Sequence, residues 1–179
     1  MNEISSIKIC KTRNVKTPTR GTSLASGLDF YVPEDLTPED MDKMAEKTGH
    51  KIEYKVSDWT GFVSEMTIGW GESACIPSGI KARLPDGWCM EFHNKSGVAM
   101  KRGLIAGAQL IDCDYQGVWH IDLHNTSKIP AVVKAGDKIA QFVMYKTEYP
   151  SVEEVPEEDL FKDAESERGE GAFGSTDKK

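Results

Sequence analysis

The sequence has none of three features that would each assign a chain to a particular class of protein. Its four cysteines form no C-x-x-C pair, and three of them lie beside apolar residues in strand-like segments: Cys10, Cys75, Cys89 and Cys113. We expect buried free thiols in a reducing cytosol. No run approaches the roughly 20 apolar residues of a membrane span, and the first residues lack the charged and apolar regions of a signal peptide. The sequence thus predicts a soluble, cytoplasmic protein with no membrane partner.

The third missing feature is an excess of basic residues. Lys and Arg number 22 against 29 Asp and Glu, which gives a formal net charge of −7. A protein that grips duplex nucleic acid presents a basic surface, so we expect no nucleic-acid partner. A phosphorylated ligand would need local cations or backbone N–H groups. The 179 residues suffice for one domain whose core needs no disulfide.

Short apolar runs recur along the chain with Gly or Pro between them. Such a pattern predicts many short strands and therefore an all-β fold, a jelly-roll-like β-sandwich. The predicted strands cover residues 4–10, 28–32, 72–76, 79–84, 88–93, 104–111, 118–123, 131–133 and 138–145. We expect them to form one β domain over residues 1–149.

One helix is predicted, at about residues 38–48. Thr37 is a good N-cap, Pro38 suits the first helical position, and Gly49 suits the C-terminal end. Residues 51–71 alternate only weakly, so residues 36–71 resemble an insertion. A decorated loop is one interpretation of this insertion, and a cover or a surface for a protein partner is the other.

Residues 150–179 are predicted to form a flexible C-terminal arm. The composition becomes acidic and poor in large apolar side chains after Tyr149, which is typical of a solvated segment. The arm ends in R-G-E-G-A-F-G-S-T, residues 168–176. Its arginine and permissive glycines could wrap a phosphate chain while Phe173 covers a base. A Gly/Ser-rich tail without function is the other interpretation.

Residues 110–117, L-I-D-C-D-Y-Q-G, place two acids beside an aromatic ring and a glycine. In a strand, Asp112 and Asp114 would share one face while the residues between them face the core. The two acids could then hold a water or a metal beside Tyr115. The same run is also ordinary turn chemistry, and this run alone does not decide between strand and turn.

Five segments resemble, in order, the motifs of the trimeric all-β dUTPase family, whose members split dUTP into dUMP and pyrophosphate. They are residues 25–29 (A-S-G-L-D), 94–99 (N-K-S-G-V-A, followed by Gly103 and Leu104), 107–117, 136–141 (G-D-K-I-A-Q) and 168–176. Any one of them is a weak signal, but five in order at compatible spacing are a strong one. The long insertion resembles that of phage-encoded members, which would act in an infected host cell.

The resemblance implies a catalytic set of Asp112, Gln141 and Arg168. Asp112 would accept the deoxyribose 3′-hydroxyl and orient or deprotonate the water that attacks the α-phosphorus. Gln141 would position phosphate or water. Tyr115 would stack on the sugar where a ribose 2′-hydroxyl would clash. The backbone of residues 106–110 would read uracil by mimicking a pairing partner.

The resemblance also implies how dUTP and Mg²⁺ are held. Lys95, Ser96 and Gly97 would bind phosphate oxygens, and Asp29 would reach the metal through water. The arm would close over the nucleotide from a neighbouring subunit of a homotrimer with shared sites. The full substrate-binding set is Lys95, Ser96, Gly97, Ala106, Gln109, Leu110, Ile111, Asp112, Tyr115, His120, Arg168, Phe173, Gly174, Ser175 and Thr176.

Two departures from the family pattern bear on the site. Lys95 stands where the family has arginine, which exchanges a bidentate fork for a point charge. Gln109 stands where the base-reading hairpin commonly has glycine, and glutamine would be unfavourable there if the backbone needed a positive φ.

Three further hypotheses remain. The chain could be a dCTP deaminase of the same fold, because Asp122 falls where those enzymes place a catalytic glutamate. It could be a regulatory module that binds a protein through residues 36–71. His120, Asp122 and His124 share a strand face and could hold a metal, or they could simply line a polar strand pair or a trimer axis.

Overall fold

Alternating apolar residues along the chain fold as short strands in this computed structural model, which describes residues 6–166 and 169–171. By their internal contacts, residues 1–148 form one unit and residues 149–179 a second. The strands, all in the first unit, are β1 (Lys8–Lys11), β2 (Thr19–Arg20), β3 (Leu28–Tyr31), β4 (Glu53–Val56), β5 (Val63–Ile68), β6 (Ser73–Pro77), β7 (Ile80–Arg83), β8 (Trp88–Asn94), β9 (Leu104–Ala106), β10 (Leu110–Ile111), β11 (His120–Asn125), β12 (Ala131–Lys134) and β13 (Lys138–Lys146). The prediction of an all-β, jelly-roll-like sandwich is confirmed.

The strands form four antiparallel sheets. Their orders are β10-β8-β13-β3-β2, β6-β11-β9, β12-β5-β4 and β1-β7. In the largest sheet, Gln141 of β13 lies opposite His93 and Asp29, and Phe142 lies opposite Phe92. Since neighbouring residues of a strand point to opposite faces, Gln141 and Phe142 face opposite sides of this sheet. Both sides carry parts of the candidate site.

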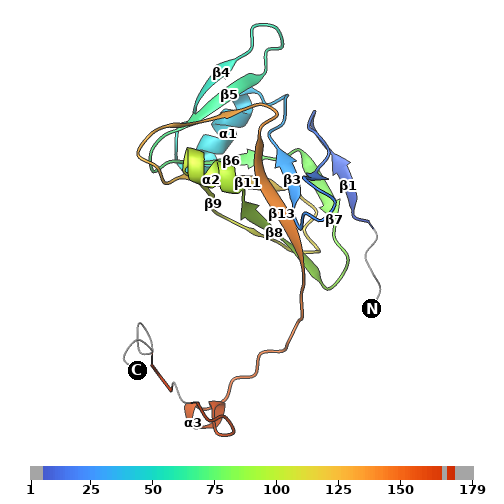
Figure 1. Cartoon of the computed structure of the whole chain (residues 1–179), viewed down its shortest axis with the longest axis vertical. Helices are drawn as coiled ribbons and strands as arrows, with labels where there is room; N and C mark the ends of the chain where they lie inside the picture. Colours follow the sequence, from blue (N-terminus) through green and yellow to red (C-terminus); the bar gives the residue numbers. More distant parts are fainter. Residues whose placement is uncertain (1–5, 167–168, 172–179) are drawn as a thin grey trace. The chain divides into compact units, whose positions relative to one another are not determined.

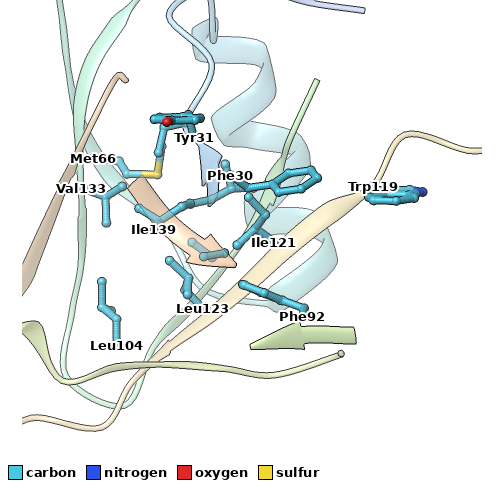
Figure 2. Packing of buried hydrophobic residues seen from close by; sticks show 14 of the residues in the cluster. Phe30, Tyr31, Met66, Phe92, Leu104, Trp119, Ile121, Leu123, Val133 and Ile139 are labelled. Atoms are coloured by element: carbon cyan, nitrogen blue, oxygen red, sulfur yellow. The ribbon is translucent and has the colours of Figure 1, made fainter. Parts of the chain in front are cut away.

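The core is built around stacked aromatic rings. The Phe142 ring centroid lies 4.3 Å from that of Phe30, 4.9 Å from Phe92 and 5.5 Å from Trp119. Figure 2 shows these side chains among the buried aliphatic residues of β11, Ile121 and Leu123. Each ring removes a large apolar area from water, so this cluster is a main source of stability for the first unit.

Helix α1 (Pro38–Thr48) occupies the predicted residues. The Thr37 side chain accepts a hydrogen bond from the Asp40 N–H, the Asp40 carboxylate accepts one from the Thr37 N–H, and Gly49 ends the helix with a φ of 74°. Met41 and Met44 point into the core, and the helix packs against β6. Figure 1 shows α1 beside the β4–β5 hairpin.

The interpretation of residues 36–71 as a decorated loop was wrong. Beyond α1, the segment contains β4 and β5, and β5 pairs with both β4 and β12. Its buried side chains belong to the main core: Leu36, Met41, Met44, Ile52, Val63, Met66 and Ile68. The alternation was hard to see because all four residues of β4 are exposed.

Three smaller expectations also need correction. Residues 104–111 form two strands, β9 and β10, instead of one, because a loop turns the chain at residues 107–109. A second helix, α2 (Ser96–Arg102), was not predicted, since it is short and has no side-chain N-cap hydrogen bond. The cysteines are free, but none is fully buried: Cys10 is exposed on β1, and Cys75, Cys89 and Cys113 are half-buried.

The second unit contains α3 (Glu157–Leu160), a single acidic turn without buried residues. The described residues 149–166 and 169–171 of this unit are almost all exposed. Among the described parts of the chain, no helix is long and apolar enough to cross a membrane.

Candidate active site

The acids at residues 112 and 114 lie in a turn. Strand β10 ends at Ile111, and the N–H of Tyr115 donates to the Asp112 carbonyl at 3.2 Å. The strand interpretation, with both acids on one face, was therefore wrong, and the turn interpretation is confirmed. Consequently the two acids are separated: Asp112 lines a pocket, and Asp114 does not.

This pocket, which we call the base-side pocket, has a volume of about 240 Å³. Apolar side chains from β8, β10 and β13 form much of its wall, and Asp112, Tyr115 and His120 add polar groups. Its lining residues are Phe92, Ala108, Gln109, Leu110, Ile111, Asp112, Tyr115, Trp119, His120 and Phe142. Six residues assigned to substrate binding from the sequence thus come together: Gln109, Leu110, Ile111, Asp112, Tyr115 and His120. Ala106 is not among the lining residues.

Tyr115 is held beside the pocket by its own turn. Its hydroxyl donates to the Val118 carbonyl at 3.2 Å. A Cβ atom on Gly117 would come within 2.4 Å of the phenol ring carbon, so only glycine permits this close approach. The ring remains about half exposed, at 46%, and can therefore still contact a ligand.

The loop between β9 and β10 has most of its backbone groups engaged. The Ala106 N–H donates to the Asn94 side chain at 2.6 Å, and the Ala108 N–H donates to the Asp122 carboxylate at 3.1 Å. The Gln109 carbonyl accepts from the Phe92 N–H at 2.9 Å. Within the described residues, the Gln109 N–H and the Ala108 carbonyl have no protein partner. A donor and an acceptor thus remain available at the pocket wall.

Asp122 and His124 support this loop. The Asp122 carboxylate accepts from the Ala108 N–H and lies 3.0 Å from His124 Nε2. Neither residue lines the base-side pocket, which argues against Asp122 as a deaminase acid. Within residues 6–166 and 169–171, no group of three His, Cys, Asp or Glu side chains is arranged to hold a metal ion. The metal interpretation of His120, Asp122 and His124 was therefore wrong, since Asp122 and His124 engage each other and His120 engages Lys47.

A second pocket, which we call the cationic pocket, has a volume of about 360 Å³. It collects four basic side chains despite the acidic net charge of the chain. Its lining residues are Lys95, Ser96, Gly97, Val98, Lys101, Arg102, Lys138 and Gln141. Lys95 is the N-cap of α2, and Ser96 and Gly97 begin it, where backbone N–H groups lack intrahelical acceptors. The predicted phosphate-binding residues thus lie together, with three cations that the sequence did not indicate.

Asp29 lies behind the cationic pocket and is only 4% exposed. Its carboxylate contacts the ammonium groups of both Lys95 and Lys138, the latter at 2.9 Å. Burial by itself would raise the pKa of Asp29, but the hydrogen bonds and charges of the two lysines outweigh it and lower the pKa below 3.8. The same contact raises the pKa of Lys138. Lys95 is therefore anchored to Asp29 at the edge of the pocket.

Gln141 is fixed between two motifs. Its side-chain amide donates to the Asn94 carbonyl at 3.0 Å. A Cβ atom on Gly27 would lie 2.8 Å from the Gln141 amide oxygen and 3.1 Å from its Cβ. Only glycine at position 27 leaves room for this side chain, which explains why a glycine precedes Asp29 in the first motif.

The resemblance implies Mg²⁺ near Asp29, and the donor set fits a limited role. A carboxylate has about four lone-pair sites, and the two lysines take only part of them. Asp29 can therefore also accept from a metal-bound water. A cation whose inner ligands are phosphate oxygens and water fits this site, because Mg²⁺ is commonly held in that way. A cage built from protein side chains does not fit, given the absence of an acidic cluster in the described residues.

The two pockets share no lining residue and open on opposite sides of the largest sheet. Gln141 lines the cationic pocket, and its neighbour Phe142 lines the base-side pocket. Within one chain, the groups suited to a base and those suited to phosphates are thus separated by β13.

Five predicted site residues lie outside the described residues: Arg168, Phe173, Gly174, Ser175 and Thr176. Their assigned roles stay predictions. The sequence also missed lining residues that alternation alone does not mark as functional. Phe92 and Phe142 have the pattern of core residues, and Lys101 and Arg102 have that of a solvated helix face.

The fold and its two pockets define a class of protein: an all-β sandwich equipped for a phosphorylated nucleoside. Comparison with known proteins agrees. The family model described as dUTPase matches residues 62–177. Mouse deoxyuridine 5′-triphosphate nucleotidohydrolase is 32% identical over 167 residues, which cover 93% of this chain and 82% of that protein. The human mitochondrial protein of that name is 33% identical over 93% of this chain and 52% of its own length. The chain belongs to the dUTPase family.

Solved structures show the same fold. The dUTPase of Staphylococcus bacteriophage 80alpha with dUpNHpp matches with a TM-score of 0.66 and 20% identity, over 97% of this chain and 99% of that one. The dUTPase of phage phi11 of S. aureus, described with a species-specific insert, matches with a TM-score of 0.63 and 18% identity, over 88% and 100%. The architecture is therefore that of dUTPases, including phage enzymes.

Proposed function

We propose that this protein hydrolyses dUTP to dUMP and pyrophosphate. The observation that carries the proposal is the base-side pocket, where Asp112, Tyr115 and the loop before β10 meet around a cavity of about 240 Å³. The pocket is small and largely apolar, with few polar groups to fix orientation, as expected for a site that selects one base. Family membership supports the same activity.

Uracil recognition is assigned to the free backbone groups of the pocket wall. The Gln109 N–H would donate to O4, and the Ala108 carbonyl would accept from N3–H. Cytosine presents an acceptor at N3 and a donor at the 4-amino group, so both contacts would fail. A mismatched buried polar group costs roughly 1–3 kcal/mol, which gives strong discrimination. Tyr115 would pack on the deoxyribose and refuse a 2′-hydroxyl.

The reaction requires a water aligned with the α-phosphorus. Asp112 would orient this water and accept its proton or pass it to solvent as the new oxygen–phosphorus bond forms. The bond from the α-phosphorus to the bridging oxygen breaks, and pyrophosphate leaves with that electron pair. Because a carboxylate is a weak base at neutral pH, alignment should account for more of the rate than proton abstraction.

The cationic pocket would hold the phosphates. Ser96 and Gly97 offer backbone N–H groups, Lys95 and Lys138 offer charge, and Gln141 would position a phosphate oxygen. The phage phi11 dUTPase coordinates a structural Mg(II) ion; here Asp29 would accept from water bound to Mg²⁺. The ion supplies positive charge that offsets the charge of the phosphates.

We further propose that the site is completed between subunits of a homotrimer. A single nucleotide cannot reach two pockets on opposite sides of β13, so the base-side pocket of one copy needs the cationic pocket of another. Closed cyclic assemblies create such shared sites at every interface. The arm, with Arg168 and Phe173, would close each site.

A substrate panel tests the activity. Purified protein with Mg²⁺ is given dUTP, dCTP, dTTP or UTP, and pyrophosphate and ammonia are measured separately. Pyrophosphate from dUTP alone is the expected result. Ammonia from dCTP would instead identify a deaminase, and no product from any of the four would contradict both enzymatic hypotheses.

A second candidate function, protein binding, is favoured by the β4–β5 hairpin. Trp59 is 97% exposed near its tip, and Tyr54, Val56 and Phe62 are also exposed. Exposed apolar side chains grouped on one hairpin are typical of interaction surfaces. The partner would be captured by wild-type protein from a host lysate and lost with Trp59→Ser, while dUTP turnover remains unchanged. Equal capture by both proteins would contradict this role.

A further inference from the structure

His120 connects the base-side pocket to the segment 36–71. Besides lining the base-side pocket, it lines a third cavity of about 250 Å³ beside α1, which we call the α1 pocket. It is the one described residue common to the linings of these two pockets. A change in the position of this ring would alter the wall of the base-side pocket.

Helix α1 contacts the His120 ring through a single side chain. The ammonium group of Lys47 lies 2.8 Å from His120 Nε2. An ammonium can only donate, so Nε2 must accept, and the ring carries its proton on Nδ1. The backbone of Val118 also hydrogen-bonds to this ring. With both sides of the imidazole engaged, the ring orientation is fixed, and it offers the base-side pocket a wall of defined shape.

The charges around His120 favour its neutral form. Burial lowers the pKa of His120 most, and the Lys47 charge lowers it further, while the Val118 hydrogen bond opposes the shift. The Lys47 contact therefore persists at neutral pH, since a protonated ring would repel the ammonium. The other titratable or charged groups lining the two pockets are Arg13, Asp40, Lys43, Cys75, Asp112 and Tyr115.

We propose that Lys47 is a positioning residue for nucleoside recognition: it orients His120, which shapes the base-side pocket. This inference rests on the proposed dUTPase activity. It gives residues 36–71 a role in substrate binding, because Lys47 lies on the helix of that segment. The contact lies far from the phosphates, so its loss should weaken the nucleoside part of the ligand alone.

The test compares Lys47→Met with Lys47→Arg and with the control Lys43→Met. Lys43 lies one turn earlier and lines the same α1 pocket, but its partner is Glu39, at 2.7 Å. We expect Lys47→Met to raise the Kd of dUMP and the KM of dUTP by the same factor, roughly threefold to tenfold, as for one lost hydrogen bond. The kcat should change little, and Lys47→Arg should restore most of the affinity.

A spectroscopic readout separates positioning from general damage. By NMR, the pKa of His120 should rise in Lys47→Met and stay unchanged in Lys43→Met, with equal melting temperatures for all variants. If wild type hydrolyses dUTP but Lys47→Met binds dUMP normally, or raises only the dUTP constant, the inference is overturned while the function stands. If wild type fails to hydrolyse dUTP, both are overturned.

Discussion

Asp112 is the one carboxylate among the described residues that line the base-side pocket. Replacing it with asparagine keeps the shape but removes the charge that orients the attacking water. We expect Asp112→Asn to lower the kcat for dUTP by roughly 10²- to 10⁴-fold, with dUMP binding within a few-fold of wild type. Steady-state kinetics and calorimetry measure the two effects.

Asp114 provides the matched control for Asp112. It lies in the same turn and is exposed, but it does not line the pocket. Asp114→Asn should retain nearly full turnover. An Asp112→Asn enzyme with normal kcat, or equal losses for both variants, would remove Asp112 from the proposed chemistry.

Asp29 links the acid stability of the fold to the cationic pocket. Its pKa is lowered because the Lys95 and Lys138 contacts outweigh the effect of burial. The carboxylate therefore adds stability that is present above its ordinary pKa of 3.8 and is lost as the pH falls through the lower folded value. Asp29→Asn should reduce the free energy of unfolding at pH 7 by about 1–3 kcal/mol.

Urea unfolding at pH 7 and at pH values below 3.8 tests this expectation. The difference between wild type and Asp29→Asn should shrink on acidification, because the wild-type carboxylate also loses its charge. Asp114→Asn, which changes an exposed acid, should unfold like wild type at each pH. A gap that widens in acid would contradict the proposed linkage.

At the scale of single elements, local patterns predicted what local physics determines. Alternation located strands such as β8 and β13, and the Thr37 cap with Gly49 located α1. The pattern failed for β4, where no face is buried, and for α2, where seven residues carry no side-chain cap.

The candidate site was predictable only in part for a related reason. The residues of one turn, Asp112 and Tyr115, come together through local chain geometry. The Lys95–Asp29 pair joins residues 66 positions apart, and the Lys47–His120 contact joins residues 73 apart. No periodicity encodes such pairs, because they depend on how the sheets and α1 pack. The resemblance suggested phosphate contacts for Lys95 but could not reveal its anchoring carboxylate.

The buried side chains of residues 36–71 make this segment part of the folded body. Met44 of α1 is 1% exposed and packs in the main core. We expect Met44→Ala to lower the free energy of unfolding by about 2–5 kcal/mol, because it leaves a cavity. Trp59→Ala, at a 97% exposed position, should change it by less than about 0.5 kcal/mol. Chemical denaturation measures both, and equal effects would contradict the structural role of α1.

At the scale of the whole molecule, the C-terminal arm can be separated from the body by truncation. The described residues of the second unit contain no buried core of their own. Ending the chain after Ser166 should leave the melting temperature unchanged but reduce dUTP turnover by roughly tenfold or more, as expected for loss of a closing segment. A truncated protein with full turnover would show that residues 168–176 are dispensable.

The separation of the two pockets by β13 makes a prediction that no single variant can test. If each site joins the base-side pocket of one subunit to the cationic pocket of another, two inactive variants should complement each other. Asp112→Asn damages only the first pocket, and a Ser96→Glu change, which adds repulsive charge, damages only the second. Mixed trimers then contain interfaces where both contributing pockets are intact. Equal random mixing yields such interfaces in roughly a quarter of cases, so about a quarter of wild-type turnover should return after joint refolding. Sites confined to one chain would return none, and that outcome would contradict the shared-site proposal even if the protein is a trimer.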